Sequence, residues 1–281
     1  MDSKTYTNNE FVKITKSLIK IDDENKNLIS NRDFMYNRTD YKHCVLIMRL
    51  NPAGNETDAK FDKYFHLRYI PENKISEIKH LNKIKNINKY SYSKYYKPIY
   101  EIVKTVYDTI SIKWDWCNDG FEKVINENPD FNRDLEDVKL NEALRNYKEK
   151  IIEYNNESKN NDVVILLGEL FYYHETNSSK LEQLYIQNED FYNNIKCMFN
   201  KHLDSVKGNI DFVYINNGKA SKLLYKSLTG EDDFATTYYM YKYNGKDVPV
   251  FFGGMLSNGV TDIFSKLRLI NEIRTVVLNE Q

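Results

Sequence analysis

The stretch Cys44-Val45-Leu46-Ile47-Met48-Arg49-Leu50-Asn51-Pro52-Ala53-Gly54 is a short apolar run that ends in a Pro/Gly turn. An apolar run of this length, bounded by turn residues, is typical of a buried strand. Pro52 disfavours helical geometry at Asn51 and so restricts where the Asn51 carboxamide can point. Ligands of open α/β sheets bind beyond the carboxyl ends of the strands, which makes Asn51 the first candidate for a chemical site. Taken alone, the turn is better explained as an ordinary strand-to-loop junction, where Asn and Pro are common.

Three more short apolar runs follow, at 163–167, 210–215 and 248–252, and each ends in Gly or Asn. Segments with helical spacing of apolar residues alternate with these runs, which predicts a three-layer α/β/α fold. Its central sheet is mostly parallel, has four strands and is covered on both faces. The four strand ends are then expected at one edge, where they form one cleft. The predicted helices cover 9–29, 98–112, 137–154, 189–203, 219–228 and 262–276.

The domain organisation predicted from these patterns is an N-terminal helical arm at 1–40, followed by one α/β domain at 41–281. An insertion at about 113–160 interrupts this domain with a Trp-rich turn and a charged helix. No apolar run approaches the roughly 20 residues of a membrane span, and the first ten residues lack the pattern of a signal peptide. We therefore expect a soluble, cytoplasmic protein.

Composition and motifs exclude several classes of function. The three cysteines are far apart and the five histidines show no metal-ligand spacing, so neither a zinc site nor a disulfide framework is indicated. Phosphate-binding Gly-rich motifs and the nucleophile elbow of hydrolases are absent, so we predict no metal and no nucleotide cofactor. The formal charge of −1 weakens the case for a nucleic-acid partner without excluding one, since local patches set the field.

The turn after the second run, from Gly168 to Asn177, holds two carboxylates, one histidine and several aromatic side chains. A carboxylate there, such as Glu169, could be desolvated and acquire the raised pKa that a general acid or base needs. Alternatively, the aromatic residues pack on neighbouring helices while Glu and His face water. The two interpretations have similar weight.

Three other segments each have two interpretations. Residues 216–221 form either a ligand-contacting turn or only a strand exit and a helix cap. In 253–259, Met255 and Leu256 either enter a nucleic-acid stack or close the core, and the second is favoured unless other features indicate DNA. Residues 89–97 interleave Lys with Tyr, which suits phosphate contact with base stacking as well as it suits an exposed loop.

The order of these pieces resembles the uracil-DNA glycosylase superfamily. Arg49-Leu50-Asn51-Pro52-Ala53 occupies the place of the family's Gly-x-Asn-Pro-Gly or Gly-Gln-Asp-Pro-Tyr turn, so that Asn51 falls on the catalytic Asn or Asp. Pro98–Ile102 and Tyr214–Ala220 are similar to a helix start and a strand exit of the family, and 253–259 lies where an intercalating loop is expected. The chain departs from the pattern at Arg49, at Gly168-Glu169 in place of a base-reading Asn, and in lacking the loop histidine.

This resemblance implies a glycosylase that binds double-stranded DNA, flips a base and cleaves its N-glycosidic bond, with no cofactor. Asn51 would orient the attacking water, and an aromatic residue would stack on the base. Glu169 would accept hydrogen bonds from an amino group, which implies an amino-bearing or modified pyrimidine, such as a substituted cytosine, and hence a role in DNA repair or in antiviral defence against modified phage DNA. The implied residues are Asn51 and Glu169 for catalysis, Pro52, Tyr64, Phe65, Gly168, Tyr172 and Asn217 for base binding, and Lys94, Lys97, Met255, Leu256 and Ser257 for DNA binding.

Two other hypotheses stay open. The chain could be a non-catalytic member of this fold that binds DNA or a protein partner, because many motif positions depart from the family. It could also be an unrelated α/β hydrolase that acts on a small nucleotide, with Glu169, His174 and Glu175 as its acid/base set.

Overall fold

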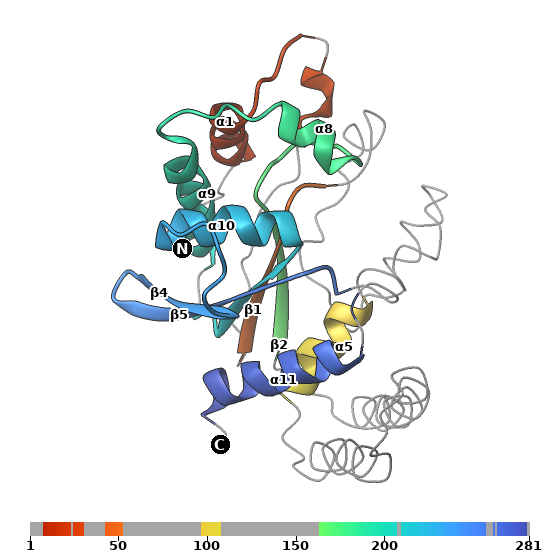
Figure 1. Cartoon of the computed structure of the whole chain (residues 1–281), viewed down its shortest axis with the longest axis vertical. Coiled ribbons are helices and arrows are strands. Elements are labelled where there is room, and N and C mark those ends of the chain that lie inside the picture. The colour runs from red at the N-terminus through yellow and green to blue at the C-terminus, as the bar shows by residue number, and fades with distance from the viewer. Residues whose placement is uncertain are drawn as a thin grey trace, which may run out of the picture. The chain divides into compact units, whose positions relative to one another are not determined.

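The computed structural model describes residues 8–23, 25–30, 43–52, 97–107, 163–206, 209–256, 261 and 263–279. The chain forms two compact units, one from residues 1–71 and 164–255 and the other from 72–163 and 256–281. The first unit contains the sheet and most of the helices among the described residues (Figure 1).

The first unit is built on a five-stranded sheet with strand order β2-β1-β3-β5-β4. Its strands are β1 (His43–Arg49), β2 (Val163–Glu169), β3 (Phe212–Asn216), β4 (Tyr238–Tyr243) and β5 (Lys246–Gly253). β3 pairs in parallel with both β1 and β5, while β4 is antiparallel to β5. Beyond the ends of β1 and β2, Leu170 N donates to Arg49 O and Phe171 N to Leu50 O, so these two chains run in the same direction. The predicted mostly parallel sheet is confirmed.

The strand count was wrong, because four strands were predicted and the sheet has five. The additional strand is β4, which forms a hairpin with β5 through Asn244 and Gly245. Both turn residues have positive φ, 48° for Asn244 and 77° for Gly245. An Asn-Gly pair is the preferred sequence for a two-residue hairpin turn, so this strand had a signal in the sequence that the analysis overlooked.

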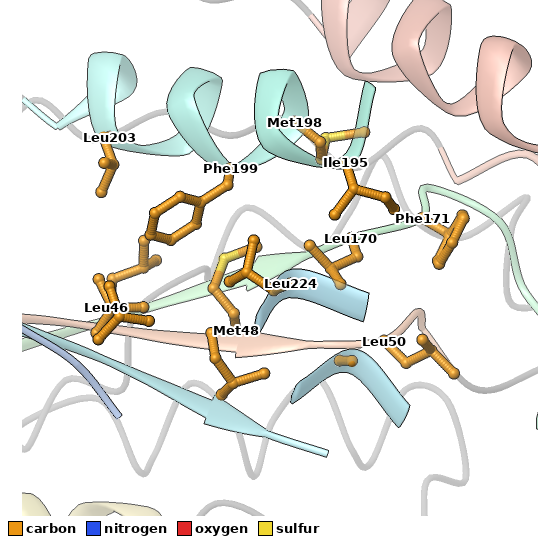
Figure 2. Close-up of a cluster of buried hydrophobic side chains, with 14 of the residues drawn as sticks. Leu46, Met48, Leu50, Leu170, Phe171, Ile195, Met198, Phe199, Leu203 and Leu224 are labelled. Carbon is orange, nitrogen blue, oxygen red and sulfur yellow. The ribbon is translucent and has the colours of Figure 1, made fainter. Parts of the chain in front are cut away.

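Strand β1 is buried on both faces, since Cys44, Val45, Leu46, Ile47 and Met48 are all fully buried. This explains why its sequence is a continuous apolar run rather than an alternation of apolar and polar residues. Figure 2 shows side chains of one face of the sheet pointing toward a helix that lies above the strands. The side chains drawn there include Leu46 and Met48 of β1, and Leu50 and Leu170 just after β1 and β2.

The helix above the strands in Figure 2 is α9 (Phe191–Ser205). Its buried residues Ile195, Met198 and Phe199 belong to the same apolar cluster as Met48 of β1 and Leu224 of the neighbouring helix α10 (Gly218–Thr229). These two helices confirm the predictions at 189–203 and 219–228 to within two residues at each end. α10 ends at Gly230, whose φ of 83° is the left-handed geometry that glycine adopts at low cost.

The N-terminal residues are part of this first unit. Helix α1 (Asn8–Leu18) packs against α9, and its Phe11 ring stacks on Tyr172 with 4.9 Å between centroids. The helix predicted over 9–29 is therefore too long. After Leu18 the chain forms single β-bridges from Ile19 to Tyr185 and from Ile29 to Tyr173, with a short 3-10 helix η1 (Lys26–Leu28) between them. These bridges attach the N-terminal residues to the chain that follows β2.

The second unit contains α5 (Lys97–Val106) and α11 (Ile263–Leu278), which correspond to the helices predicted at 98–112 and 262–276. The guanidinium of the buried Arg274 on α11 donates to the carbonyls of Thr105 and Val106, at 3.3 and 2.9 Å. A cation at the carboxyl end of α5 satisfies carbonyls that have no partner within the helix and interacts favourably with its dipole. The predicted helix at 137–154 and the Trp-rich turn are not among the described residues.

Gly168 of β2 provides a test of the packing between β2 and α9. A Cβ at this position would lie 2.4 Å from Met48 Sδ and 3.0 Å from two ring atoms of His202 on α9. We expect Gly168→Ala to lower the free energy of unfolding by roughly 1–3 kcal/mol, because the added methyl overpacks the core. Urea unfolding followed by circular dichroism measures the change.

The matched control is Gly218→Ala at the first position of α10, where a Cβ would meet nothing within 4 Å. This variant should change stability by less than about 0.5 kcal/mol, as surface substitutions usually do. Equal unfolding midpoints for the two variants would contradict the close approach of α9 to β2.

Candidate functional site

The carboxyl ends of β1, β3 and β5 lie at one edge of the sheet, because these strands are parallel neighbours, and β2 runs beside β1 in the same direction. This edge carries Asn51 after β1, Glu169 at the end of β2, Asn217 after β3 and Gly253 at the end of β5. The expectation that the four strand ends gather at one edge is therefore confirmed, while their forming one cleft stays a prediction. In sheets of this kind, that edge is where ligands bind.

The Asn51 carboxamide is held by the chain that follows β2. Its Nδ2 donates to the carbonyls of Pro52 at 3.1 Å, Tyr173 at 3.1 Å and Glu175 at 2.8 Å. Carbonyls only accept hydrogen bonds, so these contacts identify the NH₂ end of the amide and fix its orientation. The Oδ1 atom is the opposite end of the group, and no described residue donates to it. Asn51 thus presents an acceptor in a fixed direction at the sheet edge.

Residues 170–175 are fixed from two sides. On one side, Phe171 N donates to Leu50 O and Glu175 N to Pro52 O, which extends the pairing of β1 and β2 past the strand ends. On the other side, this segment pairs with residues 28–30 through two further backbone bonds, from Ser30 N to Tyr172 O and from His174 N to Leu28 O. The segment whose carbonyls accept from Asn51 is therefore bonded to the backbone on both of its sides.

Arg49 and Glu169, the last residues of β1 and β2, form an ion pair between Nη2 and Oε1. The Glu169 side chain is only 3% exposed, whereas Arg49 is 23% exposed. A carboxylate this deeply buried needs a compensating charge, and the guanidinium supplies it. The chain departs from the glycosylase pattern at Arg49 and at Glu169, and the ion pair explains why these two residues occur together. It also means that the carboxylate predicted to act in catalysis and to read an amino group is already engaged by Arg49.

Two predicted base-binding residues belong to the core instead. Gly168 faces Met48 and His202, so its lack of a side chain serves the packing of α9 rather than the approach of a ligand. Tyr172 is fully buried and stacks on Phe11, which leaves it no surface for contact with a base. The prediction for these two residues is corrected accordingly.

His202 is a residue that the sequence analysis did not single out. It is fully buried on α9, and its Nε2 lies 2.9 Å from the Glu169 carbonyl, which can only accept, so Nε2 carries the proton. Its ring also packs on Phe11, at 4.7 Å between centroids. His202 thus positions the end of β2 from inside the core. Its place on the apolar face of α9 gave no signal that distinguished it from an ordinary core residue.

The residues at the ends of β3 and β5 have mainly structural bonds. Asn217 Oδ1 accepts from Lys219 N and Ala220 N, both at 3.0 Å, which confirms the helix-cap interpretation.

Three more predicted contact residues differ in their exposure to solvent. Pro52 is buried. Leu256 is 2% exposed, so it is not the exposed wedge that the DNA-binding interpretation needs, while Met255 is half-buried.

Other predicted positions cannot be placed on this edge. Tyr64, Phe65, Lys94 and Ser257 are outside the described residues, and Lys97 is described only as the first residue of α5. His174, the proposed base of the small-nucleotide hydrolase, is fully buried. That burial counts against the hydrolase hypothesis, which needs an imidazole that substrate can reach.

The edge also has a hollow that the sequence analysis missed. It has a volume of about 510 Å³ and lies at the first turn of α10, beside the end of β5. Its lining contains Ser178, Asn217, Gly218, Lys219, Ser221, Lys222, Phe234, Phe252 and Gly253. Of these, Phe234 is an exposed aromatic side chain from the loop before β4, and no pattern in the sequence marked it.

Within the described part of the chain, no three His, Cys, Asp or Glu side chains are arranged to hold a metal ion. The described helices also include none with the length and apolar character needed to cross a membrane.

The chain is an α/β protein with a mixed, mostly parallel five-stranded sheet. Comparison of the chain with protein-family models, curated proteins and solved structures found no match in any of the three.

Proposed function

We propose that this protein is a DNA glycosylase that hydrolyses the N-glycosidic bond of a flipped, amino-bearing or modified pyrimidine in double-stranded DNA. The observation that carries the proposal is the fixed Asn51 carboxamide at the carboxyl edge of β1, with its Nδ2 bonded to three carbonyls and its Oδ1 directed away from them. An acceptor held in this way can align a water molecule for attack without reorganising during the reaction.

The chemistry places two demands on the site. Cleavage of the bond builds positive charge on the sugar and negative charge on the leaving base, and the attacking water must be held near the sugar. Asn51 can orient that water but is a poor base, so the reaction depends on a good leaving group or proceeds slowly. The extruded base must also be recognised at its edge.

The Arg49–Glu169 pair offers donors and acceptors for such recognition. Arg49 is the more accessible member, and its N–H groups would donate to the ring nitrogen or carbonyl of a cytosine. If the guanidinium moves aside on binding, Glu169 can accept from the exocyclic amino group. Uracil has a carbonyl in that place, which a carboxylate repels. We therefore propose a substituted cytosine, as in modified phage DNA, as the substrate class.

The test is abasic-site formation on matched duplexes that contain cytosine, a substituted cytosine or uracil at one position. We expect cleavage of the substituted-cytosine duplex, and a rate at least about 100-fold lower for Asn51→Ala, the usual effect of losing one preorganised polar group at a reacting centre. Asn193→Ala, an exposed asparagine on α9, is the matched control and should retain the full rate. Thermal unfolding of both variants shows whether a lost rate reflects lost structure.

The absence of abasic sites on every duplex, or full activity in Asn51→Ala, would contradict the glycosylase proposal. A non-catalytic DNA-binding or protein-binding module is the second candidate, favoured by the engagement of Glu169 with Arg49. Retarded migration of labelled duplex without cleavage would support that alternative.

A further inference from the structure

The hollow beside α10 has an aromatic wall. Phe234 and Phe252 lie 5.9 Å apart between ring centroids, and both pack against Tyr225, at 5.0 and 5.2 Å. The Tyr225 hydroxyl accepts from Ala235 N at 3.0 Å and contacts the Glu231 carboxylate, so it ties down the loop that carries Phe234. Phe234 is nevertheless 43% exposed, the most of any large apolar residue identified in the described chain. An exposed aromatic ring that is held in place is a surface on which a planar ligand can stack.

The loop that carries Phe234 is acidic, with Glu231, Asp232 and Asp233 before the ring, whereas the charged side chains in the lining of the hollow are cations. Among the residues that the structure describes, the charged ones in this lining are Lys219 and Lys222. Lys219 forms an ion pair with Glu182 at 2.8 Å, whereas the described residues include no ion-pair partner for the exposed Lys222. Ser178 and Asn217 add polar groups to the lining. The hollow therefore combines an aromatic face with an available cation, and its volume is within the range of small-ligand sites.

We propose that this hollow binds a nucleotide, with the base stacked on Phe234 and the phosphate held by Lys222. Stacking on an aromatic residue tolerates any base, and a lysine recognises phosphate as a point charge. The dipole of α10 adds a further favourable field for the anion at the rim. The nucleotide can come from a DNA strand or from the free nucleotide pool. The proposal goes beyond bond cleavage, because neither Phe234 nor Lys222 has a role in the chemistry assigned to Asn51.

Two binding measurements distinguish the sources. Fluorescence anisotropy with a short labelled single-stranded oligonucleotide measures strand binding, and calorimetry with deoxycytidine monophosphate measures binding of the free nucleotide. In whichever of the two measurements detects binding, Phe234→Ala should weaken the affinity by about tenfold or more. This is the usual cost of losing one stacked base. Its control is Met240→Ala, which truncates the other large exposed apolar side chain and should leave affinity unchanged.

Lys222→Glu should also weaken binding. The slope of log affinity against log salt should become shallower by about 1, because one phosphate contact is lost. Lys242→Glu, at an exposed position on β4, is the charge-matched control. Binding in neither arm, or equal affinity for wild type and Phe234→Ala, overturns the proposal. Asn51→Ala should retain nucleotide binding whether or not the wild type forms abasic sites, so failure of the glycosylase proposal and failure of this one are distinguishable.

Discussion

Asn51→Asp is expected to destabilise the protein more than Asn51→Ala, although Asp is the smaller chemical change. In the wild type, Nδ2 donates to three carbonyl oxygens at 2.8–3.1 Å. A carboxylate would direct an oxygen at those same carbonyls, so the variant loses the bonds and adds repulsion between acceptors. We expect a loss of roughly 3 kcal/mol or more for Asp, against roughly 1–2 kcal/mol for Ala, which removes the donors without adding a charge. Urea unfolding near neutral pH measures both.

The pH dependence provides an internal control for this prediction. Protonation turns the introduced carboxyl into a donor, so the folded state of Asn51→Asp binds its proton more tightly than the unfolded state. Stability of the variant must then rise relative to Asn51→Ala as pH is lowered, and fall as pH is raised. A variant with Asp that is as stable as the wild type at neutral pH would show that the amide is not oriented as described. The glycosylase resemblance alone predicts tolerance, because its family uses Asn or Asp at this position.

The sequence was sufficient to predict the elements that rest on local signals. β1 and β3 are apolar runs bounded by turn residues, and α10 has an Asn cap and a Gly stop. Their identity and approximate bounds follow from these patterns. β4 was missed because Tyr238–Tyr243 is a partly exposed, Tyr-rich edge strand with no apolar run, even though the Asn-Gly turn after it was informative.

The site was only partly predictable, because its bonds join residues far apart in the chain. Asn51 and Glu169 could be placed at one edge from the parallel topology alone. The contact between Arg49 and Glu169 spans 120 residues, and it depends on the register of β1 against β2, which no local pattern specifies. The core position of Tyr172 depends likewise on α1 folding back onto the chain after β2. These tertiary contacts place the Glu169 carboxylate in an ion pair and the Tyr172 ring in the core, neither of which the local sequence specifies.

Arg49→Met is expected to be more damaging than Glu169→Gln, although both break the same ion pair. Removal of Arg49 leaves a carboxylate that is 3% exposed without its compensating guanidinium, which should cost roughly 3–5 kcal/mol. Glu169→Gln leaves a neutral amide that can still accept from Arg49, and the guanidinium, 23% exposed, stays partly hydrated. Glu169→Gln should therefore lower the free energy of unfolding by roughly 1–2 kcal/mol. Urea unfolding of the two variants gives the order.

The double variant Arg49→Met/Glu169→Gln completes a double-mutant cycle for this contact. It should be more stable than Arg49→Met, because the second substitution removes the uncompensated buried charge that the first one creates. Additive losses would show that the two side chains do not interact energetically. Activity on a substituted-cytosine duplex then separates two roles of Glu169. If the carboxylate reads the amino group, Glu169→Gln loses cleavage while remaining folded, whereas a purely structural carboxylate would make its rate follow its stability.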